Sequence, residues 1–135
     1  MATKYIVDTH ALIWHFEGNS LLGASAKAVT SDPNSELILP AVALAEAMFI
    51  VEKGRCLLTS VRDLLDDVHA DNSINIFPLT SGILEESASL IIIPEIHDRL
   101  IVATGVYLQN LGETIEMLTK DKIITASALL TVCWT

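Results

Sequence analysis

The stretch Lys4-Tyr5-Ile6-Val7-Asp8 decides the expected fold, because it is a short apolar run that ends in an acid. Short apolar runs of this kind are typical of buried β-strands. Four further runs lie at residues 36–39, 74–77, 115–119 and 129–134. Helical patterns fill the intervals between them. Strands that alternate with helices indicate an α/β domain around a mainly parallel sheet.

The helical segments are marked by their apolar periodicity and by their end signals. They are expected at residues 11–17, 25–32, 40–53, 59–69 and 94–110, with one more helix after Thr80 or Ser81. We therefore expect a three-layer α/β/α sandwich with a central, mainly parallel five-stranded sheet. The length suits one domain, so residues 1–135 are expected to form a single unit.

The composition is unusually apolar for a protein of this size, with 51% hydrophobic residues and a mean hydropathy of +0.49. No apolar run reaches the about 18 to 20 residues that cross a bilayer. The first residues do not have the pattern of a secretion signal, which predicts a cytoplasmic protein with no membrane contact. Apolar content beyond the needs of one core predicts a homodimer or a complex with a partner protein.

The net charge of −9 disfavours a protein that grips nucleic acid through bulk electrostatics. A site that binds divalent cations must itself be acidic, however, and a bound cation reverses the local sign of charge. The bases Arg99, Lys120 and Lys122 lie next to acids of interest in the sequence. We therefore consider them candidate contacts for a substrate phosphate.

Two acids follow predicted strands: Asp8 comes after the first strand and Asp121 after the fourth. Ligands of parallel α/β sheets bind beyond the carboxyl ends of the strands. Each acid could equally serve as the N-cap of a helix, and for Asp121 that helix would be a short one beginning at Lys122. The position alone leaves both readings open.

Two further acids occupy apolar helices. Glu46 is the only charged residue between Pro40 and Val51, so we expect a helix that is buried on every side. A buried carboxylate is costly unless it is paired, protonated or bound to metal. Asp98 begins a helix whose next turns are almost entirely apolar, although the helix dipole also favours an acid there.

Oxygen-only ligands suit hard cations such as Mg²⁺ or Mn²⁺, which leave coordination positions open for water and phosphate. The chemistry that follows from such a site is phosphodiester hydrolysis. The sequence thus predicts that Asp8, Glu46, Asp98 and Asp121 converge on one divalent-metal centre.

Four segments carry a resemblance to a known family, in order and with fitting spacing. They are Tyr5-Ile6-Val7-Asp8-Thr9-His10-Ala11-Leu12-Ile13-Trp14, Ala43-Leu44-Ala45-Glu46-Ala47, His97-Asp98-Arg99-Leu100-Ile101-Val102-Ala103-Thr104 and Leu118-Thr119-Lys120-Asp121-Lys122-Ile123-Ile124. Together they resemble PIN domains, particularly the VapC-like toxins of bacterial toxin–antitoxin pairs. The resemblance covers nearly the whole chain.

This resemblance implies an Mg²⁺- or Mn²⁺-dependent endoribonuclease that forms a homodimer and is inhibited by a small antitoxin protein. Asp8, Asp98 and Asp121 would be the direct or water-mediated metal ligands, while Glu46 would orient a metal-bound water or act as base. Thr9 and Thr119 would support these ligands through their hydroxyls. The alternative is a catalytically silent PIN-like module that binds protein or RNA.

Other acidic α/β families fit less well. The pair His97-Asp98 is shared with HD-type phosphohydrolases, but their fold is all-helical. A response-regulator receiver needs a phosphoacceptor aspartate at the end of its middle strand, and residues 74–79 contain none. A phosphatase of the haloacid-dehalogenase type needs a second aspartate two residues after the first, where this chain has His10.

Overall fold

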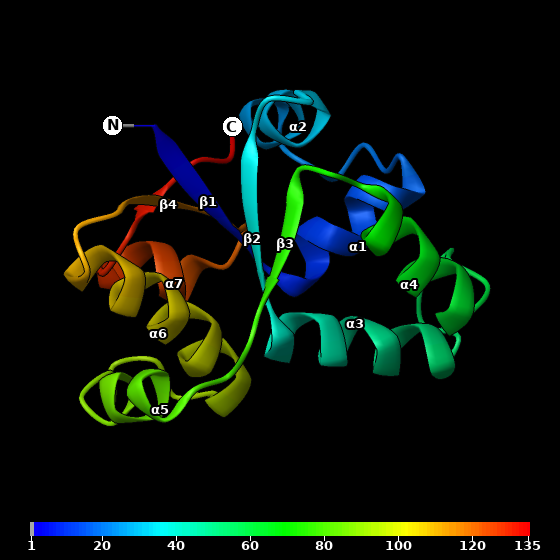
Figure 1. The fold of residues 1–135 in the computed structure, drawn as a ribbon. Coiled ribbons are helices and arrows are strands. Elements are labelled where there is room, and N and C mark those ends of the chain that lie inside the picture. Colours follow the sequence, from blue (N-terminus) through cyan, green and yellow to red (C-terminus); the bar gives the residue numbers. More distant parts are fainter. Residues whose placement is uncertain (1) are drawn as a thin grey trace.

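The structure is a computed structural model that describes residues 2–135, and it is built around one five-stranded sheet (Figure 1). The strands are β1 Thr3–Val7, β2 Glu36–Pro40, β3 Ile74–Phe77, β4 Thr114–Leu118 and β5 Thr131–Val132. The helices are α1 Thr9–Glu17, α2 Ala24–Ser31, α3 Ala41–Glu52, α4 Val61–Ala70, α5 Ser81–Ser87, α6 Ile96–Asn110 and α7 Lys122–Ser127.

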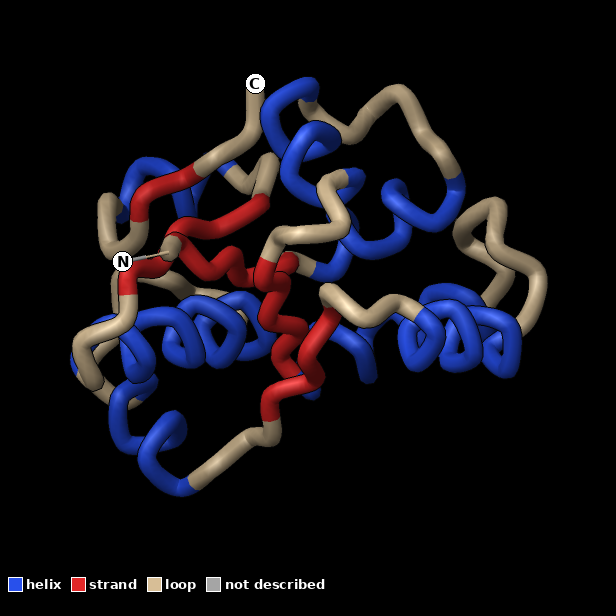
Figure 2. The backbone as a smooth tube through the Cα atoms, turned by 45° about the horizontal axis from the view of Figure 1, so that its top comes forward, coloured by secondary structure: helices blue, strands red, loops and turns tan. Residues whose placement is uncertain are grey.

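Every strand pair in the sheet is parallel, and the strand order is β3-β2-β1-β4-β5. Helices cover the sheet on both sides, as the tube in Figure 2 shows. The α3 helix packs with α1 and α4, while α5 packs on α6, which itself lies against β1 and β4. The expected three-layer sandwich is thereby confirmed, and the sheet is fully parallel.

The pairing of β1 with β4 positions the ends of both strands side by side. Val7 lies opposite Leu118, and the backbone N–H of Asp8 donates to the carbonyl of Leu118 at 3.2 Å. The chain leaves β1 toward β2 and leaves β4 toward β5, so the strand order reverses between these two strands. Ligands of open parallel sheets bind at such a reversal, beyond the carboxyl ends.

Residues Leu100 to Gly105 form the most deeply buried helical segment, because all six are buried. We call this segment the stem of α6. Gly105 allows this close packing: a Cβ there would lie 2.5 Å from a methyl carbon of Leu130 and 3.1 Å from the Ile6 side chain. The helix is therefore held tightly against the sheet, and its first turn projects at the carboxyl edge of β1.

Two sequence expectations about helices were wrong. The α3 helix is not buried on every side, because only Ala43, Leu44, Ala47 and Val51 are buried while Phe49 is 53% exposed. One stripe of α3 packs inward, and its opposite stripe is apolar yet open. The α6 helix begins at Ile96 rather than at Pro94, since the side chain of Glu95 caps it.

No helix within residues 2–135 combines the length and the apolar character that crossing a bilayer would require.

Candidate functional site

Asp8 lies between β1 and α1 and serves as the N-cap of α1. Its Oδ1 accepts the backbone N–H of Thr9 at 2.8 Å, and its Oδ2 accepts the hydroxyl of Thr119 at 2.6 Å. Burial raises the pKa of the Asp8 carboxyl, and the hydrogen bonds from Thr119 and Thr9 oppose that rise. The capping role and a position at the strand edge therefore coexist in one side chain.

Asp121 occupies the equivalent place after β4, as the N-cap of α7. Its Oδ1 accepts the backbone N–H of Ile124 at 2.9 Å. Its own N–H donates to the hydroxyl oxygen of Thr119 at 3.1 Å, and that hydroxyl donates to Asp8. Thr119 thus connects the two strand-end acids through one buried oxygen.

Glu46 reaches the same region from α3. Its Oε1 accepts the hydroxyl of Thr9 at 2.8 Å, and its side chain is 28% exposed. The sequence offered no cation within reach along the helix itself. The fold places an imidazole from α6 beside this glutamate, because the Nδ1 atom of His97 lies 3.6 Å from Glu46 Oε2.

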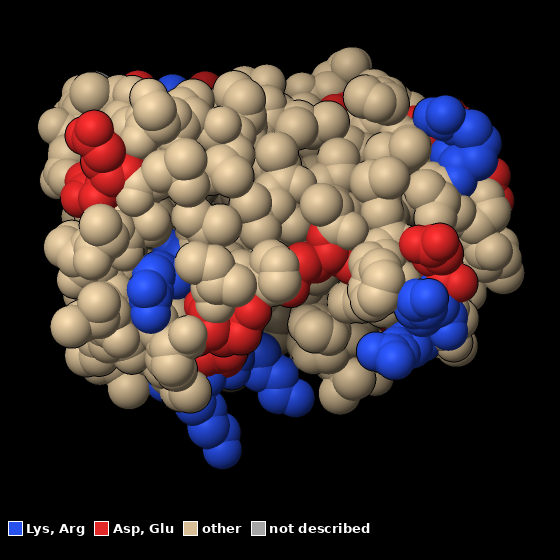
Figure 3. All heavy atoms as spheres, turned by 90° about the horizontal axis from the view of Figure 1, so that it is seen from below, with Lys and Arg blue, Asp and Glu red and all other residues tan. Residues whose placement is uncertain are grey.

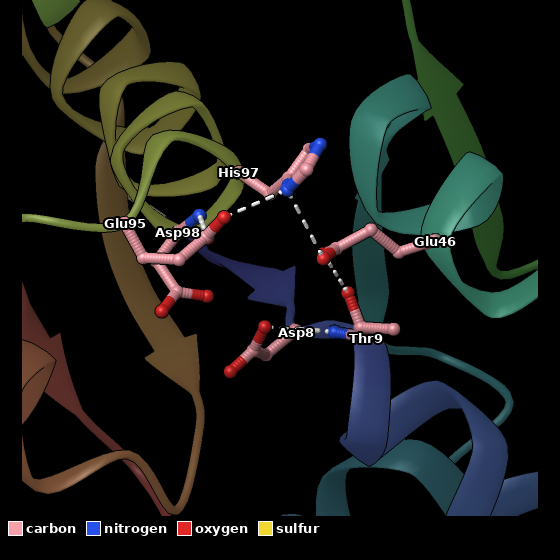
Figure 4. Close-up of polar contacts among 6 residues, drawn as sticks. All are labelled: Asp8, Thr9, Glu46, Glu95, His97 and Asp98. Carbon is pink, nitrogen blue, oxygen red and sulfur yellow. Dashed lines mark hydrogen bonds and ion pairs between the residues drawn. The ribbon is translucent and has the colours of Figure 1, made fainter. Parts of the chain in front are cut away.

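Asp98 stands in the first turn of α6, with its carboxylate directed toward that of Asp8 (Figure 4). Burial raises the pKa of Asp98 to about 7, with repulsion from Asp8, Asp121, Glu95 and Glu46 adding to the rise. Hydrogen bonds link the other three predicted acids, because Thr9 contacts both Asp8 and Glu46 and Thr119 contacts both Asp8 and Asp121. The four carboxylates do not form a group with all ligand-type atoms within 4.8 Å of one another among the residues that the structure describes.

Glu95 and His97 are site residues that the sequence reasoning did not select. With Glu46 they form a group whose ligand-type atoms all lie within 4.8 Å of one another. Glu95 Oε2 accepts the backbone N–H of Asp98 at 2.8 Å, and Glu95 Oε1 lies 2.7 Å from His97 Nδ1. Capping preferences do not reveal Glu95, because glutamate is not among the favoured N-cap residues. The only signal in the sequence was the presence of a glutamate two residues before His97 and three before Asp98.

The three candidate phosphate contacts differ in their surroundings. The Nε of Arg99 donates to the carbonyl of Ile93 at 2.8 Å, which ties this side chain to the preceding loop. Lys120 stands with its Nζ 5.6 Å from the ring centre of Trp14. Lys120 and Lys122 line a groove together with Thr119 and Trp134.

The strand ends point toward one face of the molecule, which Figure 3 views from below. Acidic side chains gather near the middle of this face, with lysine and arginine side chains around them. Despite the overall charge of −9, this face therefore also presents lysine and arginine side chains.

The chemistry of the donor set fits a hard divalent cation. Asp8, Glu46, Asp98 and Asp121 offer oxygen atoms alone, which Mg²⁺ and Mn²⁺ prefer. Burial raises the pKa of Asp98 most, and a divalent cation would relieve the repulsion that adds to this rise.

Comparisons with known proteins give one family match and several likenesses of fold. A family model described as PIN domain matches residues 5–128. None of the curated proteins matches this chain. Three solved structures share its fold at low sequence identity.

The first is a toxin–antitoxin complex from Klebsiella pneumoniae, with 21% identity, 97% of this chain and 96% of that chain covered, and a TM-score of 0.63. VapBC2 from Rickettsia felis, bound to a DNA fragment from the promoter, has 14% identity, 97% and 98% coverage, and a TM-score of 0.71. VapC20 from Mycobacterium tuberculosis, a toxin that cleaves the sarcin–ricin loop, has 14% identity, 96% and 99% coverage, and a TM-score of 0.69. At identities this low, the likeness is one of fold.

Proposed function

The chain belongs to the PIN domain family, and on this premise we propose that it is a metal-dependent endoribonuclease. The proposed centre consists of Asp8, Glu46, Asp98 and Asp121. The observation that carries the proposal is the arrangement of oxygen donors from two helices and two strand ends, in which Thr119 links Asp8 to Asp121 and Thr9 contacts both Asp8 and Glu46.

In this proposal Asp8, Asp98 and Asp121 hold Mg²⁺ or Mn²⁺. When bound, such an ion polarises a phosphoryl oxygen, lowers the pKa of a water and stabilises the leaving oxygen. The chain's own residues supply the geometry. Thr119 fixes Oδ2 of Asp8, and the caps of α1 and α7 fix Asp8 and Asp121 to rigid backbone.

Glu46 has a separate role, because it stands on the α3 side of the site with Thr9 holding one of its oxygens. From there it orients the attacking water or accepts its proton. The RNA backbone approaches along the groove that Lys120 and Lys122 line, since Thr119, which donates to Asp8, also lines this groove. Lysines at that position offset part of the repulsion between a polyanion and an acidic protein.

We further propose that the protein acts as the toxin of a VapBC-type pair, as a homodimer controlled by a small antitoxin. The likeness to toxin–antitoxin structures supports the pairing. Several exposed apolar side chains support an interface, among them Phe49, Ile91 and Ile92 at 53%, 74% and 62% exposure. Sedimentation at micromolar concentrations should give the mass of a dimer, and a monomer mass throughout would contradict the homodimer.

The decisive experiment compares wild-type protein with Asp8→Asn on labelled RNA, with Mg²⁺, Mn²⁺ or a chelator. We expect divalent-dependent internal cleavage by the wild type and none by Asp8→Asn, which should remain folded by circular dichroism. Cleavage that persists in Asp8→Asn would contradict the proposed centre. A wild-type protein that cuts no RNA, and whose melting temperature no divalent ion raises, would favour the silent binding module.

A further inference from the structure

Three side chains from two helices meet at the open rim of the proposed centre (Figure 4). Glu46 comes from α3, His97 lies in the first turn of α6, and Glu95 caps that helix. His97 is 52% exposed and Glu95 48% exposed, so neither contributes to the core. Their arrangement is nevertheless specific, because each makes a directed polar contact.

Glu95 is held at both of its oxygens. Oε2 accepts the backbone N–H of Asp98, and Oε1 faces His97 Nδ1 at 2.7 Å. An ionised carboxylate can only accept hydrogen bonds, so Nδ1 must be the protonated nitrogen in this contact. The ring of His97 is thereby oriented by a residue that is itself tied to the backbone of Asp98.

The same Nδ1 edge faces Glu46 across the gap between α6 and α3. Nδ1 lies 3.6 Å from Oε2, which is too long for a hydrogen bond but places the polar edge of the ring directly beside the carboxylate. The other oxygen of Glu46 accepts the hydroxyl of Thr9 at 2.8 Å. One carboxylate is therefore held from α1 on one side and from α6 on the other.

Such a hold matters because a glutamate has several rotatable bonds and the neighbouring acids repel it. A partly exposed carboxylate without contacts would turn away from Asp8 and Asp98 and toward solvent. We propose that Glu95 and His97 are a positioning pair, which fixes the orientation of Glu46 in the centre. The proposal deepens the proposed nuclease function and rests on it.

The pair acts through Glu46, in the way that outer residues orient metal-site carboxylates. Loss of such partners typically reduces activity or metal affinity by about 10- to 100-fold.

Steady-state cleavage of RNA by His97→Ala, His97→Asn and the control His69→Ala tests the role. His69 is an exposed histidine on α4. We expect His97→Ala to lower kcat about tenfold with KM nearly unchanged. His97→Asn should recover most of the loss, because its amide nitrogen carries two hydrogens near the position of Nδ1. An unaffected kcat in His97→Ala, or no recovery by His97→Asn, would overturn the proposal.

A double-mutant cycle on Mn²⁺ affinity, measured by calorimetry, shows whether the effect passes through Glu46. His97→Ala should weaken Mn²⁺ binding about tenfold in the wild-type background and leave the affinity of Glu46→Gln unchanged. Equal weakening in both backgrounds would overturn the positioning role while the nuclease function stands. A second Mn²⁺ bound by the wild type but not by His97→Ala would also overturn the positioning role, because Glu46, Glu95 and His97 would then themselves form a metal site. A wild type that binds no Mn²⁺ and cuts no RNA would remove the proposed function and this role together.

Discussion

The first turn of α6 and the two turns that follow it are built for opposite purposes. Asp98 in the first turn is half-buried, and this burial raises its pKa to about 7 together with repulsion from the neighbouring carboxylates. Ile101, Val102 and Ala103 are each 0% exposed and carry no charge. A buried apolar segment thus follows a turn whose repelled carboxylate we expect to destabilise the protein in the absence of metal.

The contrast between the charged first turn and the apolar stem shows where residues are placed at a cost to stability. Apolar packing along the stem stabilises the fold by about 25 cal/mol per Å² of apolar surface removed from water. The turn above it gathers carboxylates without a matching set of lysines or arginines in contact with them, among residues 2–135. Natural proteins leave buried or crowded charges without opposite charges chiefly at functional sites.

The largest expected effect comes from removing charge in the turn. Asp98→Asn should reduce RNA cleavage at least about a thousandfold, equivalent to about 4 kcal/mol of transition-state stabilisation. The same change should raise the melting temperature of the metal-free protein, because it removes a repelled and partly buried charge. Asp67→Asn, at an exposed position on α4, is the matched control and should change neither quantity. Full activity in Asp98→Asn would contradict the assignment of Asp98, in the first turn of α6, to the proposed metal centre.

Truncation in the stem should act in the opposite direction. Ile101→Ala should lower the free energy of unfolding by about 2 to 5 kcal/mol, because it leaves a cavity in a fully buried position. Mn²⁺ affinity should remain close to that of the wild type at temperatures where the variant is folded. Leu57→Ala, at a side chain with 76% exposure, should cost about 0.5 kcal/mol or less. Chemical denaturation measures both, and a similar loss for the two variants would contradict the assigned burial.

A smaller effect concerns pH in the absence of metal. The pKa of Asp98 is raised from its ordinary 3.8 to about 7, so the folded state binds more protons than the unfolded state between these values. The stability of the metal-free protein should therefore fall as pH rises through this window, and the raised pKa of Asp8 acts in the same direction.

Thermal melts at pH 5.5 and pH 8, with chelator or with Mn²⁺, measure this dependence. Mn²⁺ should raise the melting temperature by a few degrees more at about pH 8 than at about pH 5.5, because protons compete with the cation for the same oxygens. An equal rise in melting temperature at both pH values would contradict competition between protons and Mn²⁺ for the carboxylate oxygens.

Much of this fold could be predicted from residue order. The apolar runs ending at Val7 and Leu118 predict strands, and the parallel pairing then brings Asp8 and Asp121 to the same edge. These features follow from local pattern together with one rule of sheet topology. The roles of Thr9 and Thr119 were expected instead from the family resemblance, and in the structure Thr9 donates to Glu46 and Thr119 to Asp8.

The rest depends on packing between distant segments. The apolar sequence of α3 does not reveal that one stripe stays open, because that depends on which helices cover it. The contact of Glu46 with His97 arises only when α3 and α6 pack against each other. The N-cap role of Glu95 also runs against capping preference, so helix-start signals favour Pro94 instead.

The most direct test of the central claim is the anomalous scattering of a crystal soaked in Mn²⁺. The account predicts an ion about 2 Å from carboxylate oxygens of Asp8, Asp98 and Asp121, with Glu46 beside it or linked to it through water. Well-ordered Mn²⁺ bound only elsewhere on the molecule, or no ion among these carboxylates at saturating concentration, would contradict it.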